Sequence, residues 1–344
     1  MKIGLTSYSS SIPLYGEEEL ILSFRELLSN YYQIHPEEKV MIDDRAGFLA
    51  DGYFYFNMES QNLETIQMEQ TVLAYYLREN GVRQMALPIK NMKEEWFTEY
   101  RNSKFLVYQV TERNMKRESP GRSLALFHQI GSTYGFEPQT ISSYGEWKRL
   151  WIDKLTLFEE GIHQQVEDRN AISKILLDTL PYIIGMSENA IQYLRETEET
   201  ESRFSEMDQG TVTFLRFQDQ FNREVLWPDQ LGYDHPARDL AEYIRLLLLT
   251  GQSEDALLEF IRDYQIIRPL TLFGWRLVYA RLLFPIHLFD AMEPLLMSEH
   301  PPGKEEEYLH LIDRQGKYEE RLRDFFLKVG VDKAEAGLTE VEWL

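Results

Sequence analysis

The chain has 344 residues, no cysteine and a formal net charge of −21. This charge disfavours nucleic acid and anionic membranes as partners, because such ligands are bound mainly by clustered lysine and arginine. The lack of cysteine excludes disulfides, thiolate metal sites and cysteine nucleophiles, and it suits an intracellular, reducing compartment.

The first part of the chain mixes helix and strand patterns. Residues 1–20 contain no continuous apolar segment, so we expect no signal peptide. Acidic residues from Glu17 precede apolar residues at helical spacing, which predicts an amphipathic helix. The segment from Lys39 to Met58 is typical of strands, with a break at Gly47 and a hairpin turn at Asp51-Gly52.

The next elements predict a second helix and two further strands. The helix should run from about Leu63 to Asn80 and end at Gly81, a residue type that often follows a helix C-terminus. The strands should lie at Met85 to Ile89 and at Phe105 to Val110. This order of helix, hairpin, helix and two strands resembles the small lobe of a kinase.

Helical periodicity dominates the chain after about Asn114. One segment, Thr211 to Phe217, is typical of a strand, and Glu224 to Trp227 is its expected partner. The apolar stretch from Leu270 to Met297 is interrupted by several charged residues, so we predict no membrane span. We therefore expect a small mixed lobe of residues 1–112 and a larger, mostly helical lobe of residues 113–344.

Two short motifs carry a resemblance to a known superfamily. Residues 236–241 read Pro-x-x-Asp-Leu-Ala, with Pro236 and Asp239 at the turn that opens a helix, and residues 124–128 read Leu-Ala-x-x-His. Both motifs resemble those of aminoglycoside phosphotransferase-like and choline kinase-like proteins. Within that superfamily the chain is most similar to the spore-coat kinase-like proteins of the CotS and YutH type. The resemblance implies an α+β fold of the protein kinase-like, bilobal kind.

The residues that would bind nucleotide differ from the pattern that the resemblance implies. A working kinase of this type needs a lysine on the phosphates and a glutamate that orients this lysine. No lysine occurs between Lys39 and Lys90, and the matching strand offers Asn57 or a tyrosine instead. Glu64 or Glu69 could occupy the glutamate position on the next helix, but neither would have a lysine to orient.

The residues that would perform catalysis and bind metal also depart from the pattern. No histidine is followed two residues later by aspartate, so the His-x-Asp motif is missing, and Asp219 is the only carboxylate near its expected place. Alignment on the Pro-x-x-Asp-Leu-Ala turn puts Trp227 where a magnesium ligand belongs, although an indole provides no oxygen ligand. If this alignment is right, we expect the Trp227 ring to be buried in the cleft against large-lobe aromatics such as Phe217, which lies where the His-x-Asp motif should fall. Asp229 and Asn222 are weak candidates for metal ligands, and both Asp219 and Asp229 are more typical of turn residues.

These departures predict a kinase-like protein that binds other proteins without catalysing phosphoryl transfer. Catalytic, cofactor and metal sites are then absent. The resemblance implies spore coat components as partners, and a location in the cytoplasm or the spore coat. Two alternatives remain open: an active small-molecule kinase that uses ATP and Mg²⁺ with Asp219 and Asp229 in unusual roles, and a regulator that binds ATP without chemistry.

Overall fold

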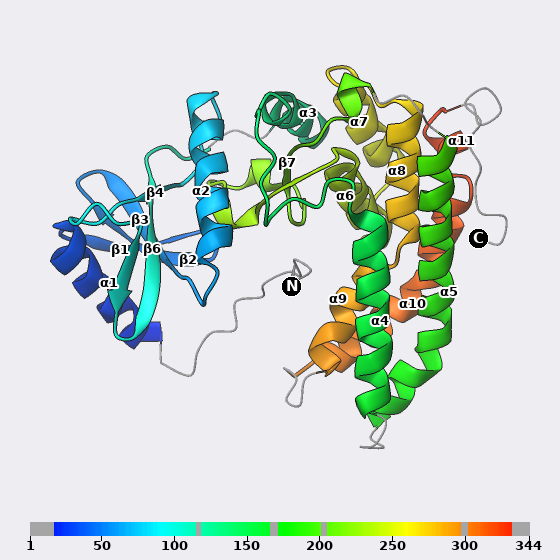
Figure 1. The fold of residues 1–344 in the computed structure, drawn as a ribbon, viewed down its shortest axis with the longest axis horizontal. Helices are drawn as coiled ribbons and strands as arrows, with labels where there is room; N and C mark the ends of the chain where they lie inside the picture. The colour runs from blue at the N-terminus through cyan, green and yellow to red at the C-terminus, as the bar shows by residue number, and fades with distance from the viewer. Residues whose placement is uncertain (1–16, 115–117, 166–170, 201–204, 297–301, 332–344) are drawn as a thin grey trace.

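The computed structural model describes residues 17–114, 118–165, 171–200, 205–296 and 302–331. Residues 1–20, in which we predicted no signal peptide, lie largely outside these ranges. A lobe built around a β-sheet packs beside a larger lobe of helices, and α2 and a short two-stranded sheet lie between the main bodies of the two (Figure 1). The predicted α+β, kinase-like architecture is confirmed, and the comparisons reported below agree with it.

The small lobe contains an antiparallel sheet and two helices. The strands lie in the order β1-β2-β3-β6-β4, and β5 also pairs with β6. Its elements are α1 (Glu17–Tyr32), β1 (Glu38–Ile42), β2 (Arg45–Ala50), β3 (Tyr53–Glu59), α2 (Glu64–Glu79), β4 (Leu87–Ile89), β5 (Phe97–Tyr100) and β6 (Ser103–Val110).

The turns of the first three strands confirm one prediction and correct another. Asp51 and Gly52 both have positive φ, of 50° and 79°, and form the predicted hairpin turn. Gly47, however, lies inside β2, and the chain turns earlier, at Asp43 and Asp44, with φ of 47° and 64°. Gly47 is required for close packing, because a Cβ atom there would lie only 2.4 Å from the carbonyl oxygen of Tyr55.

Two further small-lobe predictions can be compared with the structure. Helix α2 ends at Glu79, and Gly81 has a φ of 99°, as expected of the glycine that follows a helix. Strand β5 (Phe97–Tyr100) was not predicted from the sequence. It has four residues and pairs with β6 alone, so it lacks the long alternating pattern that identifies a strand.

The large lobe is mostly helical. None of its described helices is long and apolar enough to cross a membrane. The helices are α3 (Pro120–Gly131), α4 (Trp147–Gln165), α5 (Ala171–Thr200), α6 (Ala237–Leu249), α7 (Glu254–Gln265), α8 (Leu272–Leu283), α9 (Ile286–Met292), α10 (Lys304–Arg323) and α11 (Phe325–Lys328). Helices α4 and α5 pack along each other, and α5 lies on the side of the large lobe that is far from the small lobe (Figure 1).

The two-stranded sheet of the large lobe corrects the predicted strand pairing. Strand β7 (Thr211–Phe214) pairs with β8 (Leu231–Asp234), not with Glu224 to Trp227. That segment instead runs along residues 84–86, where Ala86 N–H donates to the carbonyl of Leu226 and Leu226 N–H donates to that of Gln84, both at 2.9 Å. Residues 224–227 therefore contact the small lobe although they are distant from it in sequence.

Each face of the small-lobe sheet buries a separate apolar cluster. Because side chains alternate along a strand, Phe48, Tyr55 and Val107 lie on the face covered by α1, where they contact Phe24 and Leu28. The opposite face carries a second cluster made by β3, β6 and the segment 225–227. Its buried members are Ile42, Phe56, Ala86, Leu106, Tyr108, Val110, Val225 and Trp227.

Candidate functional site

The position aligned with a magnesium ligand holds a buried indole. Trp227 is 1% exposed, and its ring lies edge-on to Phe56, with ring centres 4.9 Å apart, and to Tyr108 at 6.5 Å. The guanidinium of Arg45 lies 4.4 Å above the same ring. These partners belong to the small-lobe strands β3, β6 and β2. Trp227 is therefore a packing residue of the small lobe.

Phe217, the predicted partner of Trp227, lies in a different cluster. Its ring packs against Phe214 at 5.4 Å, Tyr243 at 5.5 Å and Phe221 at 5.7 Å, all in the large lobe. The sequence identified both aromatic residues as apolar replacements near the expected chemistry. It was wrong about their mutual contact, because residues 225–227 turn toward the small-lobe sheet whereas Phe217 stays with α3 and α6.

Asp229 is bound by a cation from the small lobe. Its Oδ2 accepts a hydrogen bond from Arg45 Nη2 at 2.7 Å, and the two side chains are 25% and 27% exposed. The backbone carbonyl of Asp229 also accepts from the buried amide of Gln70, on α2, at 3.1 Å. A magnesium ion at Asp229 would have to compete with the Arg45 guanidinium for the same carboxylate.

The β1–β2 turn also contacts this segment directly. The carboxylate of Asp43 accepts hydrogen bonds from the backbone N–H groups of Glu224 at 3.3 Å and Val225 at 3.0 Å. The turn therefore places a negative charge beside residues 224–225. The sequence analysis did not identify this contact, and the only local signal was an Asp-Asp pair at a position where the backbone needs positive φ.

Asp219 and Asn222 lie together in one tight turn. Asp219 has φ 63° and ψ 47°, and its Oδ2 accepts from Asn222 Nδ2 at 2.5 Å. Burial raises the pKa of Asp219. Its Oδ1 is buried and accepts no hydrogen bond from any residue that the structure describes. The backbone conformation is that of a turn residue.

The two candidate positions for a phosphate-binding pair lie on different elements and have different partners. Asn57 lies in β3, opposite Val107 of β6. Glu69 lies on α2 and binds backbone amides of the large lobe. Its two carboxylate oxygens accept from the N–H groups of Gln139, Thr140 and Ile141 at 2.9–3.0 Å.

The other glutamate candidate has a lysine partner, but on a different strand. Glu64 Oε1 lies 2.9 Å from Nζ of Lys104, which belongs to β6. The Lys104 side chain is exposed to solvent and that of Glu64 is partly exposed. This pair is therefore a surface salt bridge, and such pairs contribute little to stability.

The Pro-x-x-Asp-Leu-Ala turn builds a buried polar network. Pro236 precedes α6, and Asp239, in the first turn, accepts the backbone N–H of Phe214 at 3.0 Å. His128 Nε2 lies 3.1 Å from the Asp239 carboxylate, and its Nδ1 lies 2.9 Å from the hydroxyl of Tyr264. Burial raises the pKa of Asp239 well above its usual value and lowers that of His128 well below. The network joins α3, α6, α7 and β7.

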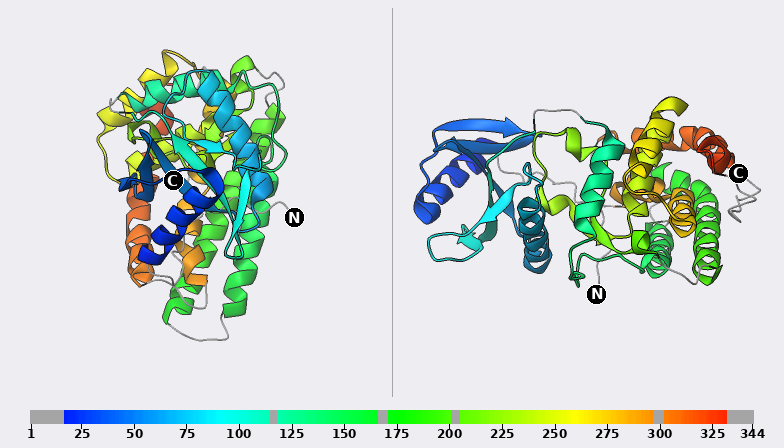
Figure 2. Two further views of the ribbon diagram at one scale, coloured as in Figure 1. Left: turned by 90° about the vertical axis from the view of Figure 1, so that its left-hand side faces the viewer. Right: turned by 90° about the horizontal axis from the view of Figure 1, so that it is seen from above.

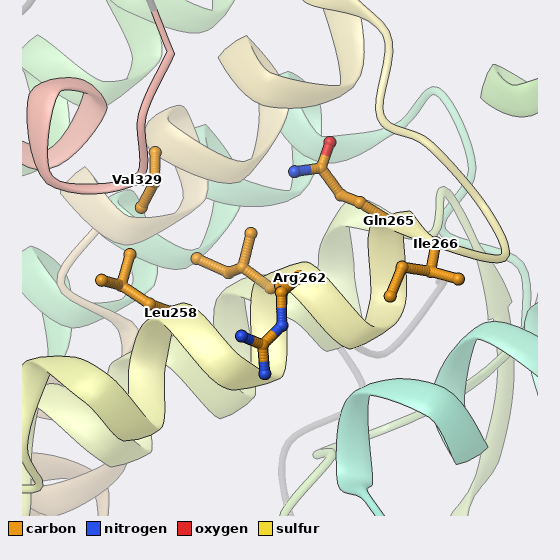
Figure 3. Close-up of a pocket in the computed structure, with 6 residues that line it drawn as sticks. Leu258, Arg262, Gln265, Ile266 and Val329 are labelled. Atoms are coloured by element: carbon orange, nitrogen blue, oxygen red, sulfur yellow. The ribbon is translucent and has the colours of Figure 1, made fainter.

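Two other features bear on possible ligands. Among the described residues, no three histidine or carboxylate side chains are placed to hold a metal ion. A shallow hollow of about 410 Å³ lies along α7, away from Trp227, and is lined by Leu258, Ile261, Arg262, Gln265, Ile266 and Val329 (Figure 3). It shares no residue with the positions that the superfamily motifs identify.

Comparison with solved structures shows the fold. An aminoglycoside phosphotransferase from Alicyclobacillus acidocaldarius is 12% identical, with a TM-score of 0.62 over 94% of this chain and 99% of its own. A microcompartment-associated aminopropanol kinase is 11% identical, with a TM-score of 0.57 over 90% and 98%. An amicoumacin kinase in complex with AMP-PNP and Ca²⁺ is 12% identical, with a TM-score of 0.56 over 93% and 97%.

Comparison by sequence shows the family. Residues 25–325 match the family model described as "Spore coat putative kinase YutH". The endospore coat-associated protein YutH of Bacillus subtilis (strain 168) is 30% identical over 310 residues, which cover 86% of this chain and 89% of that protein. The chain therefore belongs to the YutH family of spore coat kinase-like proteins.

Proposed function

We propose that this protein is a pseudokinase, which keeps the kinase-like fold and acts by binding other proteins. The observation that supports this most directly is the environment of Trp227. Where the superfamily pattern requires a metal ligand, an indole is buried against Phe56 and Tyr108, and Arg45 covers its face. The neighbouring carboxylate, Asp229, is bound by the same arginine.

The charges near Trp227 also disfavour a nucleotide. Phosphoryl transfer depends on positioned cations that neutralise the phosphates, and on carboxylate or amide oxygens that bind magnesium. Here the β1–β2 turn brings the carboxylate of Asp43 against residues 224–225. Arg45, whose guanidinium lies over Trp227, is already paired with Asp229, and Arg113 is paired with Glu224. A triphosphate would meet a negative charge and a guanidinium that is already paired.

The biological setting follows from the family. The Bacillus subtilis relative is described as endospore coat-associated. We infer that this protein also works in the spore coat, or in the cytoplasm where coat components assemble, and that its partners are coat proteins. Neither ATP nor Mg²⁺ is needed for this role.

Thermal unfolding with nucleotide tests the proposal. A ligand that binds only the folded state stabilises it, by about 2.7 kcal/mol when its concentration is 100 times Kd. We expect millimolar ATP with Mg²⁺ to leave the melting temperature unchanged. The amicoumacin kinase, whose solved structure is a complex with AMP-PNP, is a suitable positive control. A saturable rise in melting temperature would refute the loss of nucleotide binding.

One observation favours the second candidate, an active small-molecule kinase. Asp219 has a buried Oδ1 that no described residue satisfies, and burial raises its pKa, as expected of a group that exchanges a proton. Incubation with γ-labelled ATP and a panel of amino and hydroxyl compounds would detect transfer. If transfer occurred and Asp219→Asn abolished it, the pseudokinase proposal would fail. Stabilisation by ATP without transfer would instead indicate a nucleotide-binding regulator.

A further inference from the structure

An aromatic patch covers the surface where the two lobes meet, outside the segment around Trp227. Its rings come from α2, from the connection between α3 and α4, and from β8. Phe136 is exposed and three tyrosines are partly exposed, whereas the β8 ring, Tyr233, is buried. Tyr76 and Tyr134 lie 4.9 Å apart, Tyr134 and Phe136 lie 6.2 Å apart, and Tyr144 and Tyr233 lie 6.5 Å apart. Below, "the aromatic patch" means these five residues. Helix α2 and the α3–α4 connection run beside each other in both views of Figure 2.

Phe136 is the most exposed large apolar side chain among those that the structure describes, at 76%. Its ring contacts Tyr134, which in turn packs on Tyr76. The fold gains little from this side chain, because most of its surface remains in water. Single exposed apolar residues are common, but an exposed ring supported by further rings is typical of a binding surface.

The backbone that carries Phe136 is fixed on both sides. Before it, the hydroxyl of Tyr76 lies 3.0 Å from the carbonyl of Ile130 and 2.6 Å from Oγ1 of Thr133. After it, Glu69 accepts three backbone N–H groups of residues 139–141. Ser142 donates to Glu137 at 2.6 Å. A partner would therefore meet an ordered surface, which lowers the entropic cost of binding.

Two carboxylates, Glu69 and Glu137, lie beside the aromatic patch. Burial raises the pKa of Tyr134, and the carboxylate of Glu69 raises it further. Burial likewise raises the pKa of Tyr233, with Glu137 as the next cause. Glu137 itself is exposed. Aromatic faces and carboxylates both attract cations, and the whole chain carries a net charge of −21.

We propose that the aromatic patch binds a basic segment of a partner protein, with an arginine or lysine side chain placed over Phe136 and paired with Glu137. Guanidinium groups suit this surface best, because they stack on aromatic faces and form hydrogen bonds with carboxylates at the same time. The proposal goes beyond the loss of catalysis, and it does not depend on whether nucleotide binds near Trp227.

A labelled peptide tests the proposal. The probe is fluorescein-(Gly-Arg)4, measured by fluorescence anisotropy with the full chain at ~0.15 M salt, where long-range attraction between exposed charges is screened. The comparison peptide contains citrulline, which keeps the shape of arginine without its charge. We expect the arginine peptide to bind and the citrulline peptide to bind at least about tenfold more weakly, since charge-assisted contacts are the stronger ones.

Variants then locate the binding surface. Phe136→Ala and Glu137→Gln should each raise Kd about fivefold or more, as expected for anchor residues of an interface. Leu157→Ala and Glu160→Gln on α4 are matched controls, since Leu157 is also strongly exposed, at 67%, and Glu160 is exposed as well. The controls should change Kd less than twofold, and thermal melts should show all four variants folded. The proposal is wrong if the parent protein does not bind the arginine peptide, if citrulline binds equally well, or if the controls weaken binding as much as the patch variants.

Discussion

Replacing Trp227 by aspartate tests directly whether this position belongs to a packing cluster or to a metal site. The parent indole is 1% exposed and contacts Phe56, Tyr108 and Arg45. Loss of a buried large aromatic side chain costs about 3–5 kcal/mol. The new carboxylate would lie in an apolar site near Asp229, with one arginine to share, which adds a further cost. We expect Trp227→Asp to lose about 4–6 kcal/mol, a large part of the 5–15 kcal/mol typical of a folded protein.

Urea unfolding followed by far-UV circular dichroism measures this loss, with and without Mg²⁺. Trp227→Phe is the matched control, because it keeps an aromatic ring for the edge-on contact and should cost about 1–2 kcal/mol. Asp229→Asn should cost no more than about 1 kcal/mol, since its salt bridge with Arg45 is partly exposed. If Trp227→Asp lost less than about 1 kcal/mol, or if Mg²⁺ stabilised it, then the position would be a vacated metal site and our reasoning would be refuted.

Three further predictions concern the large lobe. Glu242 is buried among three arginines, so Glu242→Gln should lower the free energy of unfolding, measured in urea, by about 3–5 kcal/mol. The control Glu293→Gln removes a partly exposed pair with Lys154 and should lower it by less than about 1 kcal/mol. Asp239→Ala leaves the Phe214 N–H without its acceptor, so it should lose about 2–4 kcal/mol and speed amide exchange there. Burial lowers the pKa of His287 to about 3, so the folded state binds this proton less readily than the unfolded state does. The stability from His287 is therefore present above about pH 6.5 and is lost as the pH falls toward 3, by up to about 1.4 kcal/mol per pH unit. His287→Gln should flatten that slope and exposed His310→Gln should not.

Local sequence patterns predicted most elements of the fold because their causes are local. The Asp51-Gly52 turn needs only two residues that tolerate positive φ, and Gly81 ends α2 for the same reason. Gly47 misled the prediction because its role is not local. It lies mid-strand where Tyr55 and Phe56 of the next strand come too close for a Cβ atom, and only the paired strands reveal this. The pairing of β7 with β8 likewise depends on a distant contact, because residues 224–227 lie against residues 84–86 and are not available to pair with β7.

The candidate site was predicted less completely than the fold. The sequence predicted that the residue at position 227 is unsuitable as a magnesium ligand, because the identity of the residue, an indole without an oxygen atom, is enough to decide this. It did not show that Phe56 and Tyr108 are its neighbours, since these residues are more than 100 positions away. The contact of Asp43 with Val225 spans 182 residues and was not predictable. The sequence offered Glu69 only as a glutamate without a lysine to orient, yet it binds three backbone amides of the large lobe.

The contacts of residues 224–231 stabilise the junction of the lobes without any catalytic side chain, which agrees with the proposed pseudokinase function. In this segment Val225 and Trp227 complete the inner face of the small-lobe sheet. Its backbone is bound by Asp43, by residues 84–86 and by Gln70. These interactions require apolar volume and free N–H and C=O groups, and none of them requires a catalytic side chain. An indole in place of a metal ligand therefore adds buried area to the junction of the lobes. If the protein is a pseudokinase, as we propose, such a residue is favoured at this position, and the kinase-like frame would serve as a rigid support for the proposed binding of partners at the aromatic patch.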